Sequence, residues 1–289
     1  MSDGQPSNNS TWNRDGTRPR PSNHCIRVTS MTPLVIVVIS TMAIATVMTI
    51  IHALIRKLVV VERLQRHNDV TAAVYATFGV LYAIILGLLV SHGQTRRDIV
   101  AEAAVRESAL LVDVAQAGRA FDRTISDSLT RTCLRYAEHV YYVEWHMRKE
   151  ERESPKRRQH INAIWDITRV IEPIGSRQES SYFILLEMME SLSSARHIRL
   201  AAEGDHMSAF LELVLILGAC ITVVFLWLFG MEHHRVHLGY TWLVTFIVVL
   251  VLVLIFALDD PMRAGIGVNP EPYAKAAEEL RMLLSLPHQ

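Results

Sequence analysis

VTAAVYATFGVLYAIILGLLVSHGQT, residues 70–95, contains no Asp, Glu, Lys or Arg. At about 1.5 Å per helical residue, a run of this length can cross a hydrocarbon core about 30 Å thick. Its apolar residues do not alternate with polar ones, as they do in the strands of a membrane barrel. Because backbone groups inside lipid must be bonded within their own segment, the stretch predicts a membrane-spanning helix.

Three more apolar runs, residues 33–55, 213–231 and 238–258, have the same character. Short links, residues 56–69 and 232–237, join the four runs into two hairpins. We therefore expect an all-α protein with four transmembrane helices, in hairpins that span residues 31–95 and 207–258. A cleaved signal peptide is the alternative for the first run, but the run is longer than the apolar region of such peptides, which favours a membrane anchor.

The composition agrees with a chain divided between lipid and water. Half of the 289 residues are hydrophobic, yet 29 side chains are basic and 29 are acidic, so the apolar residues must be concentrated in blocks. A net charge of zero without a long run of one sign predicts no nucleic-acid partner. Cys25, Cys133 and Cys220 are not spaced as a disulfide framework or a zinc site, so we expect free thiols, no metal and no cofactor.

The parts outside the hairpins divide into three segments. Residues 96–206 have apolar positions at helical spacing and predict a helical domain, inserted between the hairpins. Residues 1–30 are rich in Ser, Asn, Gly, Pro and Arg and predict a disordered tail. Residues 259–289 predict a C-terminal segment with one amphipathic helix, because Tyr273 and Leu280 share a helix face.

An even number of crossings places both termini and the inserted domain on one side of the membrane. The basic residues near the membrane on that side are Arg14, Arg18, Arg20, Arg27, Arg96, Arg97, Arg196, Arg199, Arg263, Lys275 and Arg281. Those in the two links on the other side are Arg56, Lys57, Arg63, Arg66 and Arg235. The excess on the first side predicts a cytoplasmic domain. From the helical spans alone we expect the bacterial inner (plasma) membrane.

Three stretches resemble one family. They are GVLYAIILGLLV (79–90) followed by AEAAVRESALL (101–111), then LLEMMESLSSARHIRLAA (185–202), and LDDPMRAGIGVNPEPY (258–273). Together they are similar to the bestrophin-like family of membrane proteins, over residues 71–284. Two positions depart from the family pattern, with Met262 in place of Phe and Ala264 in place of Gly.

The resemblance implies a four-helix membrane part, assembly of several copies around a pore, and small anions as the transported species. It also marks signature residues at the junction between membrane and domain: Gly79, Gly87, Glu107, Arg196, Arg199, Asp259, Pro261, Gly265 and Pro270. The acidic calcium-binding cluster of animal bestrophins has no counterpart in this chain, so calcium gating is not expected.

One stripe of the second crossing is a candidate pore lining. It comprises Tyr75, Phe78, Tyr82, Leu86 and Leu89. In an oligomer these side chains could form a hydrophobic constriction. The alternative is a helix–helix interface in which aromatic side chains fill space and Gly79 and Gly87 permit close approach.

Two further polar groups have candidate roles. Arg196 and Arg199 are expected near the same membrane face as Asp259 and Asp260, and we predict an ion pair between them. Histidines in the link at residues 233–237 have the chemistry to bind a metal or sense pH, but a solvated link is the simpler interpretation.

Two functions are compatible with these patterns. The first is a bestrophin-like, homo-oligomeric anion channel in a lipid bilayer. The second is a membrane-anchored scaffold or sensor, whose cytoplasmic helices bind a protein partner. Serine and histidine residues lack the context of a catalytic triad, so we expect no enzymatic activity.

Overall fold

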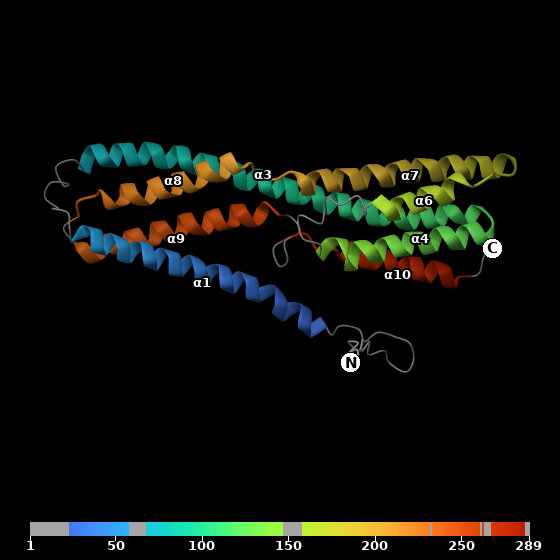
Figure 1. Ribbon diagram of the computed structural model, residues 1–289, viewed down its shortest axis with the longest axis horizontal. Coiled ribbons are helices and arrows are strands. Elements are labelled where there is room, and N and C mark those ends of the chain that lie inside the picture. The colour runs from blue at the N-terminus through green and yellow to red at the C-terminus, as the bar shows by residue number, and fades with distance from the viewer. Residues whose placement is uncertain are drawn as a thin grey trace, which may run out of the picture.

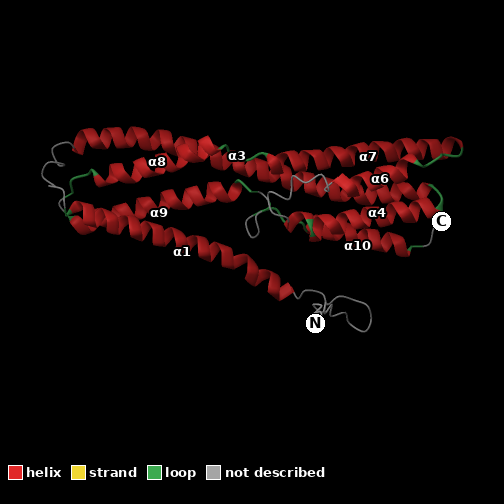
Figure 2. Cartoon of the chain, viewed as in Figure 1, coloured by secondary structure: helices red, strands yellow, loops and turns green. Residues whose placement is uncertain are grey.

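The computed structural model describes residues 23–57, 68–146, 158–231, 233–260, 262 and 267–286. All regular structure within these ranges is helical, which confirms the predicted all-α class (Figure 2). Pro261 and Gly265 lie outside the described residues, as does the predicted tail up to residue 22.

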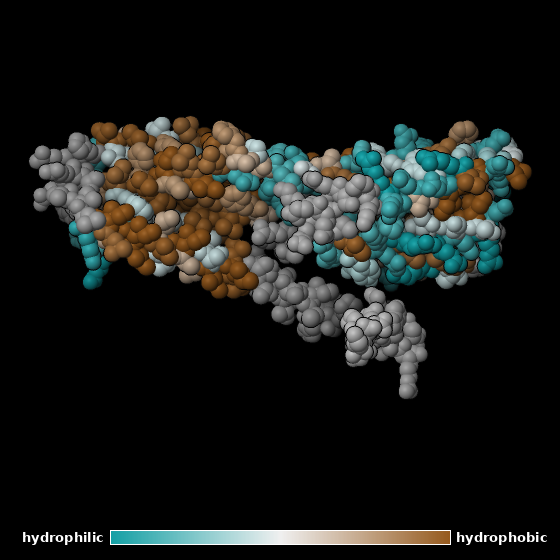
Figure 3. All heavy atoms as spheres, in the orientation of Figure 1, coloured by the Kyte–Doolittle hydropathy of each residue, from teal (hydrophilic) through white to brown (hydrophobic). Residues whose placement is uncertain are grey.

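Four helices are long and apolar enough to cross a membrane, as predicted. They are α1 (Asn23–Arg56), the first half of α3 (Asn68–Ala117), α8 (Ala209–Trp227) and α9 (His234–Leu258). The four lie together at one end of an elongated molecule (Figure 1), and apolar side chains dominate the face of this membrane part that Figure 3 shows. Such a surface is stable in lipid and not in water.

The other end of the molecule is the soluble part. It contains the second half of α3 with α4 (Arg123–Tyr142), α6 (Gln159–Arg169), α7 (Gly175–Gly204) and α10 (Glu271–Ser285). Its core is a single cluster of buried side chains that includes Leu111, Cys133, Leu185 and Leu280, one each from α3, α4, α7 and α10. The predicted helical periodicity thus marks the faces that form one core.

Two helix boundaries differ from those expected. α1 begins at Asn23, inside the predicted tail, and continues through Pro33 into the apolar run. α3 continues without a break from the membrane to Ala117, so one 50-residue helix belongs to both parts of the molecule. Apolar length shows how much of a helix lies in lipid, but not where the helix ends.

Candidate functional site

The stripe of Tyr75, Phe78, Tyr82, Leu86 and Leu89, hereafter the inner stripe, faces the other helices of the same subunit. The ring of Phe78 stacks on Phe225 of α8 with centroids 6.3 Å apart. Tyr75 meets Phe229 edge-on at 5.7 Å. The hydroxyl of Tyr82 donates a hydrogen bond of 2.7 Å to the carbonyl of Leu215. These contacts correspond to the helix-interface alternative for the stripe.

Close packing of α3 on α8 depends on Gly218. A Cβ at this position would lie 2.3 Å from Cε2 of Tyr82, so only glycine leaves room for the ring. Gly79 and Gly87 were expected to permit close approach, but a Cβ at either would meet nothing within 4 Å. Within the subunit, the glycine that admits the aromatic ring lies on α8.

The opposite side of α3, which we call the outer face, is exposed in the part of the subunit that the structure describes. It consists of exposed residues at helical spacing: Ala73, Thr77, Val80, Ile84, Gly87, Ser91 and Thr95. Thr77 and Thr95 donate their hydroxyls to the carbonyls of Ala73 and Ser91. Small and hydroxyl-bearing residues are enriched where membrane helices meet other helices or water, and not where they meet lipid alone.

A polar junction lies where the membrane part meets the soluble part. Arg96 of α3 is buried and forms an ion pair of 3.4 Å with Asp259, the residue that caps the end of α9. Asp259 also accepts a 2.8 Å hydrogen bond from the backbone N–H of Met207, and His206 lies 3.5 Å from its carboxylate. One carboxylate therefore connects α3, α9 and the segment before α8.

This junction corrects the predicted pair of Arg199 with Asp259. Arg199 lies deeper in the soluble part and binds Glu107, Glu144 and Glu203, while Asp259 binds Arg96. Sequence position placed both arginines near the membrane, but α7 turns the Arg199 side chain toward the core, and Arg96 lies closer to the end of α9.

Arg199 is the centre of a buried charge cluster. Its guanidinium lies 2.6 Å from Glu107, 2.8 Å from Glu144 and 2.6 Å from Glu203, and its side chain has no exposed surface. These carboxylates come from α3, the 3₁₀ turn Glu144–His146 and α7 itself. Burial removes water from the N–H donors of the planar guanidinium. The carboxylate oxygens replace that water as hydrogen-bond acceptors.

Two tyrosines and a second arginine complete the cluster. Tyr136 and Tyr273 both donate their hydroxyls to Glu107, the latter at 2.9 Å, and Arg196 donates to the hydroxyl oxygen of Tyr136. Of these residues, Glu107, Arg196 and Arg199 were expected from the family resemblance. Glu203 follows Arg199 by four residues, a spacing that indicates a helical pair. Tyr273 ends the family-like stretch at residues 258–273, but neither that stretch nor the positions of Tyr136 and Glu144 predict a contact with Glu107 or Arg199.

The electrostatics of the cluster favour one protonation state. Burial alone would lower the pKa of Arg199, but Glu107 above all, with Tyr273, Glu203 and Glu144, raises it well above its ordinary value. Burial raises the pKa of Tyr136 and of Tyr273 well above the usual range. Both phenols therefore stay neutral and act as donors to Glu107.

The end of the membrane part far from the soluble part holds a second polar group. Nδ1 of His52 lies 2.9 Å from the hydroxyl of Thr241, and Nε2 of His237 lies 2.9 Å from the carbonyl of Leu226. Arg56 contacts His237 and donates to the carbonyl of Met231. His237 was expected in a solvated link; it is buried, because α9 begins at His234 and carries it into the bundle.

The remaining candidates lie in ordinary structural positions. Glu212, an ionisable residue at the start of the third predicted crossing, is in the first turn of α8, where the helix dipole favours a carboxylate. Pro270 is the N-cap of α10. Within the described ranges, no three His, Cys, Asp or Glu side chains are grouped as they would be around a metal ion.

Comparison with known proteins identifies the fold. A model of the bestrophin-like domain matches residues 42–273. The structure resembles a crystal structure of a bacterial bestrophin homologue variant from Klebsiella pneumoniae, with a TM-score of 0.66, 12% identity and coverage of 86% of this chain and 99% of that chain. A second variant of that homologue gives a TM-score of 0.64 at 13% identity, with coverage of 86% of this chain and 97% of that chain.

A crystal structure described as a membrane protein gives a TM-score of 0.67 at 12% identity, with coverage of 86% of this chain and 98% of that chain. At such identities the likeness concerns the fold. A search of curated proteins found no match. The family model, however, covers most of the chain and includes the inner stripe, the junction and the charge cluster. The chain is a member of the bestrophin-like family.

Proposed function

We propose that the protein is a homo-oligomeric, bestrophin-like ion channel whose pore is lined by the outer face of α3. The inner stripe is occupied by α8, so the outer face is the side of α3 left for an axis shared by several copies. We assign the pore to this face in place of the inner stripe. The role is transport across a bilayer and not catalysis.

The observation that carries the proposal is the composition of the outer face. Along this face the helix first presents the apolar residues Val80 and Ile84. Toward the proposed cytoplasmic end it then presents Gly87, Ser91 and Thr95. An apolar stretch followed by hydroxyl-bearing residues has the character of a narrow constriction that opens into a wetter passage. A helix that met only lipid on this side would not require small polar residues there.

Small anions are the permeant species that the family resemblance implies. One observation favours cations as a second candidate. Asp98 and Glu102 continue the outer face beyond the membrane, and both are exposed. Repeated around an axis they would form rings of carboxylates, and such rings attract cations and repel anions. Asp98 and Glu102 are therefore the residues that we expect to decide charge selectivity.

The distribution of basic residues supports a cytoplasmic soluble part, with both termini on the same side. We propose the bacterial inner membrane as its location. In this orientation the charge cluster lies in the cytoplasmic domain, and the group around His52 lies at the other membrane surface.

Ion flux into liposomes tests the proposal. Purified protein should carry chloride or sodium down a gradient, and the sign of the reversal potential in a planar bilayer under a salt gradient should identify the permeant charge. Ile84→Ala should widen the constriction and raise flux several-fold. Leu213→Ala serves as the matched control, because Leu213 is also a large, exposed apolar residue but lies on α8.

If cations permeate, the double change Asp98→Asn with Glu102→Gln should shift the reversal potential toward zero. If anions permeate, the same change should raise anion flux. A protein that elutes as a monomer or dimer and conducts neither ion would exclude the channel and favour the scaffold or sensor alternative.

A further inference from the structure

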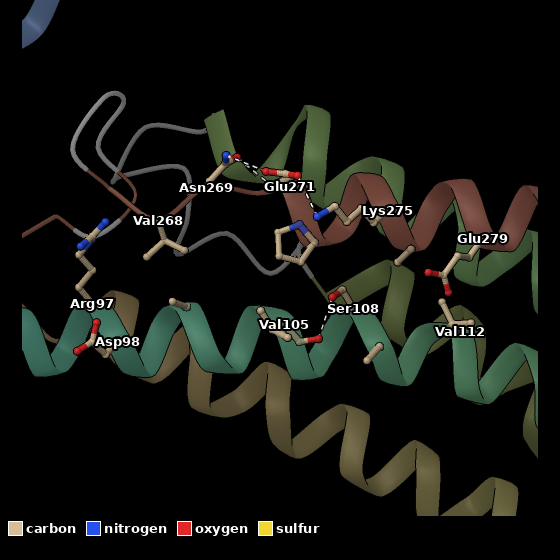
Figure 4. Close-up of a pocket in the computed structure, with 14 residues that line it drawn as sticks. Arg97, Asp98, Val105, Ser108, Val112, Val268, Asn269, Glu271, Lys275 and Glu279 are labelled. Atoms are coloured by element: carbon tan, nitrogen blue, oxygen red, sulfur yellow. Dashed lines mark hydrogen bonds and ion pairs between the residues drawn. The ribbon is translucent and has the colours of Figure 1, made fainter. Parts of the chain in front are cut away.

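A cleft of about 600 Å³ lies between α3 and α10, just beyond the membrane part. One wall is α3 from Arg97 to Val112, and the other is α10 with the segment that precedes it (Figure 4). The volume is in the range of small-molecule sites. None of its lining residues belongs to the charge cluster or to the inner stripe, and one of them, Asp98, also continues the outer face of α3.

The middle of the cleft is apolar. Ala101, Val105 and Val112 line it from α3, and Pro272 and Ala276 face them from α10. Arg97 and Val112 are fifteen residues apart on one helix, so the trough follows α3 for about 22 Å. Such a trough accommodates an elongated apolar body.

Arg97 provides a cation at the membrane end of this trough. Its Nε is shielded from solvent without a hydrogen-bond partner. Across the described residues Arg97 forms no ion pair, and Figure 4 shows Asp98 directed away from it. The neighbouring Arg96 is already bound to Asp259. A buried donor without a partner is unfavourable, and a carboxylate or phosphate is the partner that fits a guanidinium best.

The other charges give the cleft a direction. Lys275 is neutralised by Glu271, whose carboxylate lies 3.0 Å from its ammonium. Glu279 descends from α10 toward Val112 at the far end (Figure 4). The trough therefore has Arg97 at its membrane end, where Asp98 lies on the same wall but is directed away from the guanidinium, and the carboxylate of Glu279 at the other end. A ligand with one acid group fits this polarity, whereas a ligand with an acid group at each end does not.

We propose that this cleft binds a small organic monoanion, with its acid group on Arg97 and its apolar body between α3 and α10. Binding of this kind requires no ion conduction, so the inference stands apart from the proposed channel function. The chemistry points to monocarboxylates with a medium-length chain or a ring.

Calorimetric titration of the full-length protein in detergent tests this site, with protein-free micelles as the blank. Octanoate is the probe, and octanedioate, of equal length with two acid groups, is the matched comparison. Octanoate should bind at least tenfold more tightly than octanedioate. Arg97→Gln should weaken octanoate binding at least tenfold, and Glu279→Gln should reduce the discrimination against octanedioate.

A second variant makes the test independent of charge. Ala109 is exposed and lines the cleft, so Ala109→Phe fills the trough without disturbing the core, and it should also abolish octanoate binding. Thermal melting of each variant verifies folding. The proposal would be overturned if the heat of octanoate binding were the same for the parent protein, Arg97→Gln and Ala109→Phe. That result would show that octanoate only partitions into the micelle. Tighter binding of octanedioate than of octanoate would overturn it as well.

Discussion

Among single residues, Arg199 has the environment that depends most on exact partners. Removing an arginine and three carboxylates from water carries a large desolvation cost, which is offset only when every group is paired. Here Arg199 has three carboxylate partners, and Trp145 and Tyr273 lie beside its guanidinium at 5.9 and 5.8 Å. Loss of the arginine would remove the nearest cation from all three carboxylates and leave Glu107 and Glu144 with the longer, 3.7 Å contacts of Arg196.

We expect Arg199→Met to destabilise the soluble part by about 3–5 kcal/mol, the usual cost of breaking a buried charge pair from one side. Denaturant unfolding of the detergent-solubilised protein, followed by circular dichroism, measures this change. Arg169→Met is the matched control, because the ion pair of Arg169 with Asp166 is largely exposed and should contribute little. Equal effects of the two substitutions would contradict the role assigned to the cluster.

The sequence indicated part of this site. Glu107, Arg196 and Arg199 stood out through the family resemblance, and the spacing of Arg199 and Glu203 was visible in the chain. The partners Glu144 and Tyr273 were not predictable, because they approach from segments that are far away in sequence and meet Arg199 only after the helices pack. The same limitation led to the incorrect pairing of Arg199 with Asp259.

At the scale of elements, the contact of α3 with α8 determines which side of α3 faces outward. The ring of Tyr82 occupies the space above Gly218, and its hydroxyl satisfies a backbone carbonyl of α8. In lipid, helix association relies on such packing because apolar surface alone gives no preference for another helix over the bilayer. The contact therefore orients the proposed pore face.

Gly218→Ala should lower the stability of the membrane part by about 1–3 kcal/mol, since its Cβ would overlap the Tyr82 ring. Tyr82→Ala should lower the stability less in the Gly218→Ala variant than in the parent protein, because it also relieves the overlap between the new Cβ and the ring. Thermal melting in detergent gives both values. Gly239→Ala, where a Cβ meets nothing within 4 Å, is the control. Additive effects at Gly218 and Tyr82 would show that the two residues do not compete for this space.

The elements themselves were largely predictable. Long charge-free runs indicated the four membrane helices, and apolar positions three and four apart indicated the helices of the soluble part. Helix ends were less predictable, as α9 shows: charged and polar residues before Leu238 suggested a link, but His237 finds partners inside the bundle and the helix starts earlier. Tertiary hydrogen bonds, which sequence does not reveal, decide such boundaries.

At the scale of the whole molecule, the soluble part has one core, and Cys133 lies at its centre with no exposed surface. Burial raises the pKa of the Cys133 thiol to about 12, compared with an ordinary value of 9.0. Folding thus favours the protonated thiol. The stability that this provides is fully present below pH 9 and is lost as the pH rises toward 12.

Cys133 should therefore report unfolding of the soluble part. In a Cys25→Ser, Cys220→Ser background, we expect iodoacetamide at pH 8 to leave the folded protein unmodified, because the Cys133 thiol is buried and its raised pKa keeps it protonated. Denaturant should make the same thiol react at the rate of a free cysteine. Mass spectrometry over time distinguishes the two states. Rapid modification without denaturant would show that the core opens locally around α4.

The single helix α3 has a mechanical consequence. With 50 residues and no interruption, it is a rod about 75 Å long, anchored in lipid at one end and in the α4–α7–α10 core at the other. A rod of this kind transmits motion along its length: a slight tilt imposed by anything that wedges against its distal half also displaces Ile84 and Ser91 in its other half.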